Sequence, residues 1–480
     1  MENNPQPKPK KSNKTLIAVV AVVIVVIVIG SFVALDYNNL VKPSKSLSGT
    51  QYLAVYPGPN GTVSSAHLLG GHVLAEAAGS TSSADQAAAV AFMAYLMNPG
   101  VQYQYEVNTG FIPVDNYSYA SSGHQMTTIP TTPVNNSVSG TIYYYYDQTS
   151  ADVPFITSVI NDFQKMYPNV NVKSSNIAAT SIVSTVEAEV NAANGQTIVM
   201  SIDNLDIGTL YYGGYLMSIS SSTLQAIEPN GGMISSMNNL TDKMVSQFGA
   251  LYFLPPGVNI PLVWVNMNAL NAAGIKTLPS NNTQLMNDAK ALYKHYGVGM
   301  INFQGHGGAS TATELYQWIV QMGGNPMMFN STADIHTFEF LYNLSPYFSP
   351  EYKTSYWKNY LGLSSNKYSM MDYQWPGSVN LTALGMNTSK TNSVLNVSLQ
   401  AMKEGVFLRD PVQWISEWQN LIDNAWTKII VDHGNYSKIP SILSSENSSM
   451  YSYLLSTYNY TVAQNYENGD YAPIAVSSAP

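Results

Sequence analysis

The chain of 480 residues is long enough for two domains with sizeable cores, and its formal net charge of −9 gives no electrostatic basis for binding nucleic acid. Charged residues make up only 10% of it, against about 25% in ordinary soluble proteins, which favours an acidic medium, heavy glycosylation, or both. The chain contains no cysteine, which excludes disulfides and thiolate metal sites.

The N-terminal segment predicts a membrane anchor. Residues 15–35 carry no charge, and as a helix they would span about 31 Å, which matches a bilayer core. Residues 1–14 contain four lysines, which predicts a cytoplasmic tail and an exterior position for the rest of the chain. A cleaved secretory signal and a pilin-type signal cut near Lys14 are the alternatives. Residues 36–50 are typical of a polar tether.

The part beyond the anchor is acidic and rich in glycosylation sequons. Without the four lysines and the one glutamate of the tail, 16 Lys and Arg face 28 Asp and Glu. Asn-x-Ser/Thr sequons fit an extracellular location, although this composition produces many by chance. The candidate sites are Asn60, Asn116, Asn135, Asn239, Asn281, Asn330, Asn343, Asn380, Asn387, Asn396, Asn435, Asn447 and Asn459.

Residues 51–120 predict a strand followed by two helices. The strand starts near Tyr52 and is closed by a Pro-Gly-Pro-Asn-Gly turn. Ser83 and Gln86 have the spacing of a capping box before an apolar helix. Pro99 ends that helix and starts the next, because proline fits the first turn but not the interior, and Gly110 ends the second helix.

Residues 141–430 alternate between strands and helices, which predicts the α/β class. The Ser/Thr/Pro-rich residues 121–140 form a linker before them. A tyrosine-rich strand from Thr141 is followed by a helix with one apolar face and then by an alternating strand, as in parallel sheets. That face comprises Phe155, Ile156, Val159, Ile160 and Phe163. A further helix ends at Gly195, and a strand then runs into Asp203. Residues 431–480 form a Ser/Tyr-rich tail.

Four segments resemble the sugar-binding class (family 1) of extracellular solute-binding proteins of ABC importers. They are IYYYYDQ with ITSVINDFQKMYPNVNV, QTIVMSIDNLDIGTLYYGGYLMSIS, ALYFLPPGVNIPLVWVNMNALNAAGI and KYSMMDYQWPGSV. The resemblance implies a two-lobed periplasmic-binding-protein-like fold of type II, joined by a hinge. It implies a binding component for a sugar or oligosaccharide that acts with ABC permease subunits, with no catalytic residue and no cofactor.

The order of the segments departs from that family. Residues 51–120 resemble a block that family members carry after the Trp-Pro strand, and GVFLRDPVQWISEWQNLIDNAWTKII resembles the helices that close the family's chain. The sequence therefore predicts a circularly permuted or locally transposed protein, in which residues 51–120 complete the lobes formed by residues 141–430. Chain ends that lie close in space make such a rearrangement tolerable.

Candidate ligand residues follow from two arguments. Open α/β sheets bind ligands at the carboxyl ends of their strands, which selects Tyr146 and Asp147 after one strand and Asp203 and Asn204 after another. A core position for Tyr146 and a helix N-cap role for Asp203 are the alternatives.

The resemblance adds six further candidates. They are Gly71 and His72 in a Gly-Gly-aromatic loop, where tryptophan is the expected aromatic, Asn259 after the Leu-Pro-Pro segment, Gln304 and His306 in the FQGHGG loop, and Trp375 in the Trp-Pro pair. A core position is an equally good reading of Trp375.

The scarcity of arginine favours a neutral ligand. Arg409 is the one arginine in the sequence, whereas peptides, phosphates and carboxylates usually need a guanidinium partner. Its neighbour Asp410 suggests a structural ion pair. His67 and His72 have metal-like spacing but no convincing third ligand, so no metal site is predicted.

Two other classes of function stay open. A surface-layer or adhesion glycoprotein could keep the fold for a structural role. A sugar-active hydrolase would need two facing carboxylates, for which Asp147 and Asp203 are available.

Overall fold

The computed structural model describes residues 51–54, 59, 67–148, 152–228, 232–354, 371–374 and 393–476. The expected tail, anchor and tether (residues 1–50), Trp375 and the sequons at Asn60, Asn380 and Asn387 lie outside these residues. Over the described part of the chain, every helix is too short or too polar to cross a bilayer.

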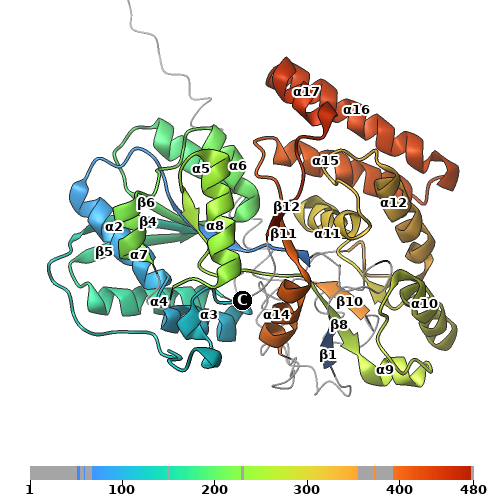
Figure 1. Ribbon diagram of the computed structural model, residues 1–480, viewed down its shortest axis with the longest axis horizontal. Coiled ribbons are helices and arrows are strands. Elements are labelled where there is room, and N and C mark those ends of the chain that lie inside the picture. The colour runs from blue at the N-terminus through green and yellow to red at the C-terminus, as the bar shows by residue number, and fades with distance from the viewer. Residues whose placement is uncertain are drawn as a thin grey trace, which may run out of the picture. The chain divides into compact units, whose positions relative to one another are not determined.

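Strands and helices alternate along most of the chain (Figure 1). The strands are β1 (Gln51–Ala54), β2 (His67–Leu68), β3 (His72–Glu76), β4 (Gly140–Tyr146), β5 (Val170–Asn176), β6 (Ile198–Asp203), β7 (Phe253–Leu254), β8 (Leu262–Asn266), β9 (Ile301–Asn302), β10 (Met371–Gln374), β11 (Val406–Leu408) and β12 (Ile474–Val476). The α-helices are α2 (Ser83–Leu96), α3 (Pro99–Thr109), α4 (Val153–Met166), α5 (Ala179–Asn191), α6 (Ile207–Tyr212), α7 (Ser221–Ile227), α8 (Ser235–Phe248), α9 (Met267–Ala272), α10 (Asn282–Tyr296), α11 (Gly308–Gln321), α12 (Thr332–Leu344), α14 (Val394–Glu404), α15 (Ile415–Trp426), α16 (Ile439–Thr457) and α17 (Tyr460–Asn468).

The first lobe is built on a five-stranded sheet of order β5-β4-β6-β3-β7. β4 pairs in parallel with β5 and β6, which confirms the predicted strand-helix-strand unit. β3 is antiparallel to both of its neighbours, although it comes from the block that precedes β4 in the chain. The N-terminal block therefore supplies a central strand of this sheet.

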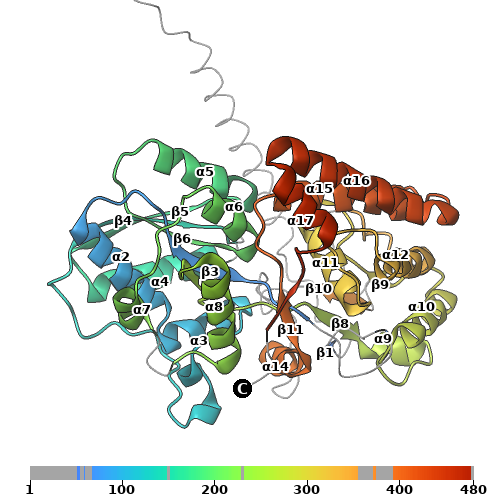
Figure 2. The same ribbon diagram turned by 45° about the horizontal axis from the view of Figure 1, so that its top comes forward.

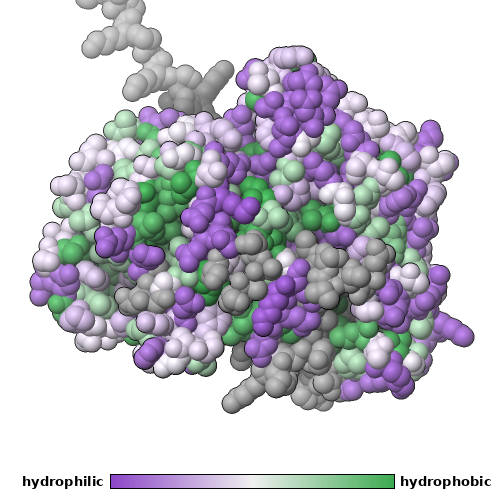
Figure 3. All heavy atoms as spheres, in the orientation of Figure 1, coloured by the Kyte–Doolittle hydropathy of each residue, from purple (hydrophilic) through white to green (hydrophobic). Residues whose placement is uncertain are grey.

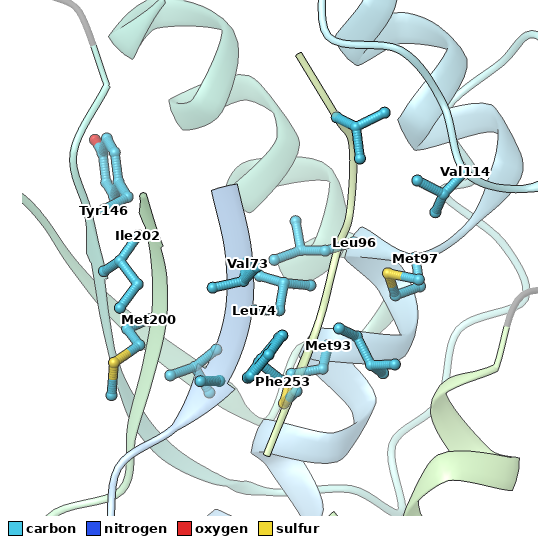
Figure 4. Close-up of a cluster of buried hydrophobic side chains, with 14 of the residues drawn as sticks. Val73, Leu74, Met93, Leu96, Met97, Val114, Tyr146, Met200, Ile202 and Phe253 are labelled. Carbon is cyan, nitrogen blue, oxygen red and sulfur yellow. The ribbon is translucent and has the colours of Figure 1, made fainter. Parts of the chain in front are cut away.

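Helix α2 packs its apolar face on this sheet. Figure 4 shows Met93 and Leu96 of α2, together with the C-cap residue Met97, gathered with Val73 and Leu74 of β3. On α4, the buried residues are the predicted ones with the exception of Phe155, which is partly buried: Ile156, Val159, Ile160 and Phe163. The aromatic ring of Phe92 lies edge-on to Tyr144 and to Phe163, with centroid distances of 4.9 Å in both pairs, so α2, β4 and α4 share one core.

The boundaries of α2 and α3 follow local capping chemistry. The N-cap of α2 is Ser82, whose hydroxyl accepts from the Asp85 amide at 3.2 Å, so the expected capping box at Ser83 was wrong by one residue. Asn98 caps α3 in front of Pro99. Gly110 ends α3 with φ of 77°, a left-handed conformation that glycine adopts without steric cost, as the sequence predicted.

The second lobe contains a four-stranded sheet of order β1-β8-β10-β9. β8 is antiparallel to β1 and to β10, and β1 again comes from the N-terminal block. A second hydrophobic cluster, separate from the first, joins this sheet to the helices from α9 to α12 and to α15. The aromatic rings of Phe303, Phe348 and Trp426 stack within it.

A three-stranded sheet of order β12-β11-β2 connects the lobes. Its middle strand contributes Leu408 to the first cluster and Phe407 to the second, because adjacent side chains of a strand point to opposite faces. The chain also passes between the two clusters from β2 to β3 and from β7 to β8. Figures 1 and 2 show β11 between the first sheet and the helices of the second lobe.

The C-terminal segment is folded rather than extended. α16 packs on α12 and α15, and buries Ile439, Leu443, Met450 and Leu454 in the second cluster. After α17 the chain returns as β12, which pairs antiparallel with β11. Figure 3 shows hydrophilic residues gathered over α17 on the outer surface of this segment.

Candidate ligand-binding site

Several of the predicted ligand residues meet at one edge of the first sheet. β4 ends beside Asp147, and its parallel neighbour β6 ends at Asp203, so both acids leave the sheet at the same edge. β3 runs in the opposite direction and begins here, with His72 paired in register with Asp203. Strand order therefore adds the loop of Gly71 and His72 to the acids that the strand-end argument selected.

His72 is held on both ring nitrogens. Its Nε2 lies 2.8 Å from Oδ1 of Asp147, and its Nδ1 lies 2.8 Å from Nε2 of Gln148. The His72 and Asp147 side chains are 12% and 4% exposed, and Phe111 packs beside the imidazole. Burial lowers the pKa of His72, but the carboxylates of Asp147, Asp203 and Asp152 together raise it by more, so the pKa lies above its ordinary value. This pair forms a rigid wall of the site.

Asp203 is the most open member of the group. Its side chain is 39% exposed, and its Oδ1 accepts from the Leu205 amide at 2.9 Å, so the alternative N-cap role holds as well. The side-chain amide of Asn204 donates to the Leu69 carbonyl at 3.1 Å, and its backbone amide donates to Gly71 at 3.0 Å. These bonds fix both residues against the crossing between β2 and β3.

Arg409 joins this edge to the second lobe. Its Nη2 donates to Oδ1 of Asn204 at 2.6 Å and to Oδ1 of Asp203 at 3.2 Å, while its Nη1 donates to the Thr313 hydroxyl of α11 at 2.7 Å. The expected pairing with Asp410 was wrong. Asp410 instead accepts from Gln247 at 3.1 Å and from the Ala472 amide at 3.3 Å. Adjacent residues after a strand point apart, which separates Arg409 from its chain neighbour.

Asp206 belongs to the same cluster, and the sequence argument missed it. Burial, together with the nearby carboxylates of Asp203 and Asp147, raises the pKa of Asp206 well above its ordinary value. Such a shift favours the protonated form of the carboxyl group, which can donate a hydrogen bond. The signal was present in the sequence as a second acid three residues after the strand.

Gly71 allows the connection between β2 and β3 to lie against the connection between β7 and β8. Its φ of +120° suits glycine, and a Cβ at this position would lie 2.9 Å from the Gly257 carbonyl oxygen. Next to it, Gly70 and Asn259 exchange backbone hydrogen bonds of 2.8 and 3.0 Å. Asn259 is thus brought to the predicted loop through its backbone, and its side chain is 5% exposed.

The predicted loop of the second lobe precedes α11. Gln304 is fully buried, and its carbonyl accepts from the Thr311 hydroxyl at 2.6 Å, whereas His306 is exposed. The amide of Gly308 donates to the carboxylate of Asp423. The loop connects to the Asp203 cluster through α11, whose Thr313 binds Arg409.

The candidate Tyr146 does not contribute an open surface, and neither does His67, the partner of His72 in the rejected metal-like spacing. Tyr146 is 3% exposed and stacks on Tyr144 with a centroid distance of 5.2 Å, so its core position explains it. Figure 4 shows it in line with Ile202 and Met200 inside the lobe. His67 is buried and lies 3.0 Å from the Glu404 carboxylate, apart from His72.

A small cavity lies among these residues. Gly71, His72, Asn204 and Leu408 are among its lining residues, and its volume is about 20 Å³. That volume accommodates about one water molecule. A ligand much larger than a water molecule therefore does not fit this cavity in the present conformation.

The sequence matches a known family over this region. Residues 147–385, about half of the chain, match the model of the bacterial extracellular solute-binding proteins. They belong to that family. The matched region of this solute-binding protein includes Asp147, Asp203, Asn204 and Thr313, all of which contribute to the cluster described above.

Solved structures of solute-binding proteins also resemble this one. The GacH receptor of Streptomyces glaucescens, solved with acarbose, is 12% identical over 67% of this chain and 100% of its own, with a TM-score of 0.47. An ABC transporter solute-binding protein from Agrobacterium radiobacter, solved with ribitol, is 12% identical over 65% and 98%, with a TM-score of 0.49. An ABC substrate-binding protein from Listeria monocytogenes, solved with cycloalternan, is 12% identical over 65% and 99%, with a TM-score of 0.48.

Proposed function

We propose that this solute-binding protein captures a neutral sugar or oligosaccharide between its lobes and delivers it to an ABC permease. The observation that carries the proposal is the commitment of the one arginine. The guanidinium of Arg409 is already bound to Asp203, Asn204 and Thr313, and its residue is 5% exposed. A ligand carboxylate or phosphate would have to compete with these partners.

The chemistry of the edge suits hydroxyl groups. Asp203 presents a partly exposed carboxylate, which accepts hydrogen bonds from the hydroxyls of a sugar. A protonated Asp206 would add a donor beside it. At this edge, the described cationic groups are already paired, Arg409 with Asp203 and His72 with Asp147. The remaining acceptors and donors match a ligand without net charge.

Binding would depend on motion between the lobes. Among the described residues, three short connections, after β2, after β7 and around β11, join the two hydrophobic clusters and would act as part of the hinge. Opening this hinge would break the contact of Arg409 with Thr313 or with Asn204 and would enlarge the small cavity. Closure on the ligand would restore the contact of Arg409 and narrow the cavity around the ligand.

The match to an extracellular family supports an exported protein, and we propose that the uncharged residues 15–35 anchor it in the membrane. The tether of residues 36–50 would keep the protein near its permease and raise the effective concentration. Five of the predicted glycosylation sites have exposed asparagines and are the ones we propose to be modified. They are Asn330, Asn343, Asn396, Asn435 and Asn459.

We also infer that the order of segments is transposed relative to the family. β1 and β3 precede β4 in the chain, yet each pairs inside a sheet formed by later strands. A rearranged gene in which residues 51–120 follow residue 392 is expected to give a folded protein with the same ligand. Failure of that protein to fold under conditions that support the natural order would contradict the inference.

The proposed function is tested by thermal shift on the purified full-length protein. Neutral mono- and oligosaccharides, amino acids and peptides are screened, and a ligand at a hundred times its Kd should stabilise the protein by about 2.7 kcal/mol. The variant Asp203→Asn keeps the cap and removes the charge, and we expect it to bind the sugar about tenfold more weakly, since charge-assisted hydrogen bonds are about twice as strong as neutral ones.

The matched control is Asp162→Asn, which changes an acid that pairs with exposed Lys165 on α4. It should leave the sugar-induced shift unchanged. A shift produced by peptides and by no sugar would overturn the proposed ligand class. A sugar shift that Asp203→Asn leaves intact would overturn the proposed site.

A further inference from the structure

A second pocket lies at the other end of β3, away from the ligand edge. Its volume is about 100 Å³, and it is enclosed by the end of β3, by α2, by the start of α7 and by the segment before α7. The lining residues are Glu76, Gln86, Val90, Met93, Met217, Ser218, Ile219 and Thr223. Glu76 follows His72 by four positions in an extended strand, which separates the two sites by about 13 Å.

The pocket contains a carboxylate without a partner. Glu76 is 7% exposed, and its Oε1 is buried with no hydrogen-bond partner among the residues that the structure describes. Burial raises the pKa of Glu76 to about 7. None of the lining residues carries a positive charge. A buried carboxylate without a counter-charge is costly, and a cation that entered the pocket would remove this cost.

The walls beside Glu76 are mostly apolar. Val90 and Met93 come from α2, and Met217 and Ile219 come from the segment that leads to α7. Methionine side chains adapt to irregular apolar groups, so these walls suit a short aliphatic chain. Ser218 is exposed at the pocket and marks its opening to solvent.

These features select the class of ligand. Ca²⁺ takes about 6–8 oxygen ligands, several of them from carboxylates. The lining residues include one carboxylate, which is too few for a Ca²⁺ site. A volume of about 100 Å³ is small compared with the pockets that hold drug-sized ligands, which favours a small ligand over an oligosaccharide. An ammonium group fits the acceptor, because it supplies both N–H donors and the missing charge.

We propose that this pocket binds a small primary alkylammonium ion, with the ammonium group on Glu76 and the alkyl chain against Met93 and Met217. The pocket would thus be a second ligand site, independent of the proposed sugar site. The same chemistry occurs in a free amine and in the side chain of a lysine on another protein. The experiment separates these two sources.

The test is an NMR titration of the full-length protein at pH 8 with n-propylammonium chloride, which is charged at that pH. Propan-1-ol and tetramethylammonium chloride serve as probes that lack the charge or the N–H donors. We expect propylammonium to bind at least tenfold more tightly than either probe. Binding of N-acetyl-lysine-N-methylamide with similar affinity would identify a lysine side chain as the source, and its exclusion would identify a free amine.

Three variants connect the binding to the pocket. Glu76→Gln preserves the shape and removes the charge, and it should weaken propylammonium binding at least tenfold. Ser218→Phe fills the opening from an exposed position and should do the same without touching Glu76. Glu106→Gln is the matched control, because burial also raises the pKa of this α3 residue to about 7 outside the pocket. Absence of binding in the natural protein, or equal binding by Glu76→Gln, would overturn the proposal.

Discussion

Arg409 and Asn204, which are 205 positions apart in sequence, are joined by a hydrogen bond of 2.6 Å. The guanidinium also reaches Asp203 at 3.2 Å and the Thr313 hydroxyl at 2.7 Å, so one side chain ties the first sheet to α11 of the second lobe. The forked donor geometry of arginine makes this possible, since three acceptors in different directions need a planar group with several N–H bonds.

Replacement of this arginine by lysine should destabilise the protein although the charge is kept. A lysine ammonium is a single point donor on a flexible stem and cannot satisfy the three acceptors together. We expect Arg409→Lys to lower the free energy of unfolding by about 2 kcal/mol, measured by urea denaturation. The variant Thr313→Val, which removes one of the three bonds, should cost about 1 kcal/mol. Equal stability of Arg409→Lys and the natural protein would contradict this role.

Substitution of Gly71 should damage the ligand edge more than substitution of a similar glycine elsewhere. An alanine Cβ at Gly71 would lie 2.9 Å from the Gly257 oxygen and 3.0 Å from Val258 Cα. Gly79 also has positive φ, +96°, but a Cβ there meets nothing within 4 Å. Gly79→Ala should therefore show backbone strain alone, roughly 1–3 kcal/mol, and Gly71→Ala should lose roughly a further 1–3 kcal/mol to the clash. Thermal denaturation of the two variants compares them, and a smaller loss for Gly71→Ala would refute the packing argument.

The protein should be more stable at pH 5 than at pH 8. Burial raises the pKa values of Glu76, Glu106 and Asp423 to about 7. In the folded protein these groups keep protons that the unfolded chain releases above about pH 4, so stability falls as the pH rises from about 4 through 7. The raised pKa of His72 acts in the same direction. Its contribution to stability is complete below 6.5, the pKa of histidine in the unfolded chain, and it is lost as the pH rises through the higher pKa of the folded protein.

Each of the three carboxyl groups should contribute roughly 1–2 kcal/mol to this difference, a value reduced for their partial exposure to solvent. Melting temperatures at the two pH values measure the effect. The triple variant Glu76→Gln, Glu106→Gln and Asp423→Asn should show a smaller difference between them. A higher melting temperature at pH 8 in the natural protein would show that the sign is wrong.

The C-terminal helices should contribute to the stability of the second lobe. Leu443 of α16 is fully buried in the second cluster, whereas Leu455 of the same helix is 45% exposed. We expect Leu443→Ala to cost about 2–5 kcal/mol and Leu455→Ala no more than about 0.5 kcal/mol in urea denaturation. Similar small losses for both variants would mean that α16 is a dispensable addition.

Local sequence signals determined much of this fold. The apolar face of α4, the stop at Asn98 and Pro99, and the exit at Gly110 depend on periodicity and on the backbone limits of proline and glycine. Such signals act within one turn or one strand, so they can be recognised without the rest of the molecule. The alternation of strands and helices in turn indicated a parallel sheet, and the acids after β4 and β6 followed from the strand-end rule.

Contacts between distant segments were decided by the tertiary structure alone. The position of β3 between β6 and β7 determines which part of the N-terminal block (residues 51–120) lies at the ligand edge. A local sequence pattern cannot predict which strand pairs with which. The same holds for Arg409, whose partner is Asp203 rather than the adjacent Asp410, and for Glu76, which reads as an ordinary strand-end acid until α2 and α7 cover it. The sequence by itself thus determined the elements and the class of chemistry, because these depend on nearest neighbours. Which side chains pair, and which charges are buried, was decided by packing between elements far apart in the chain.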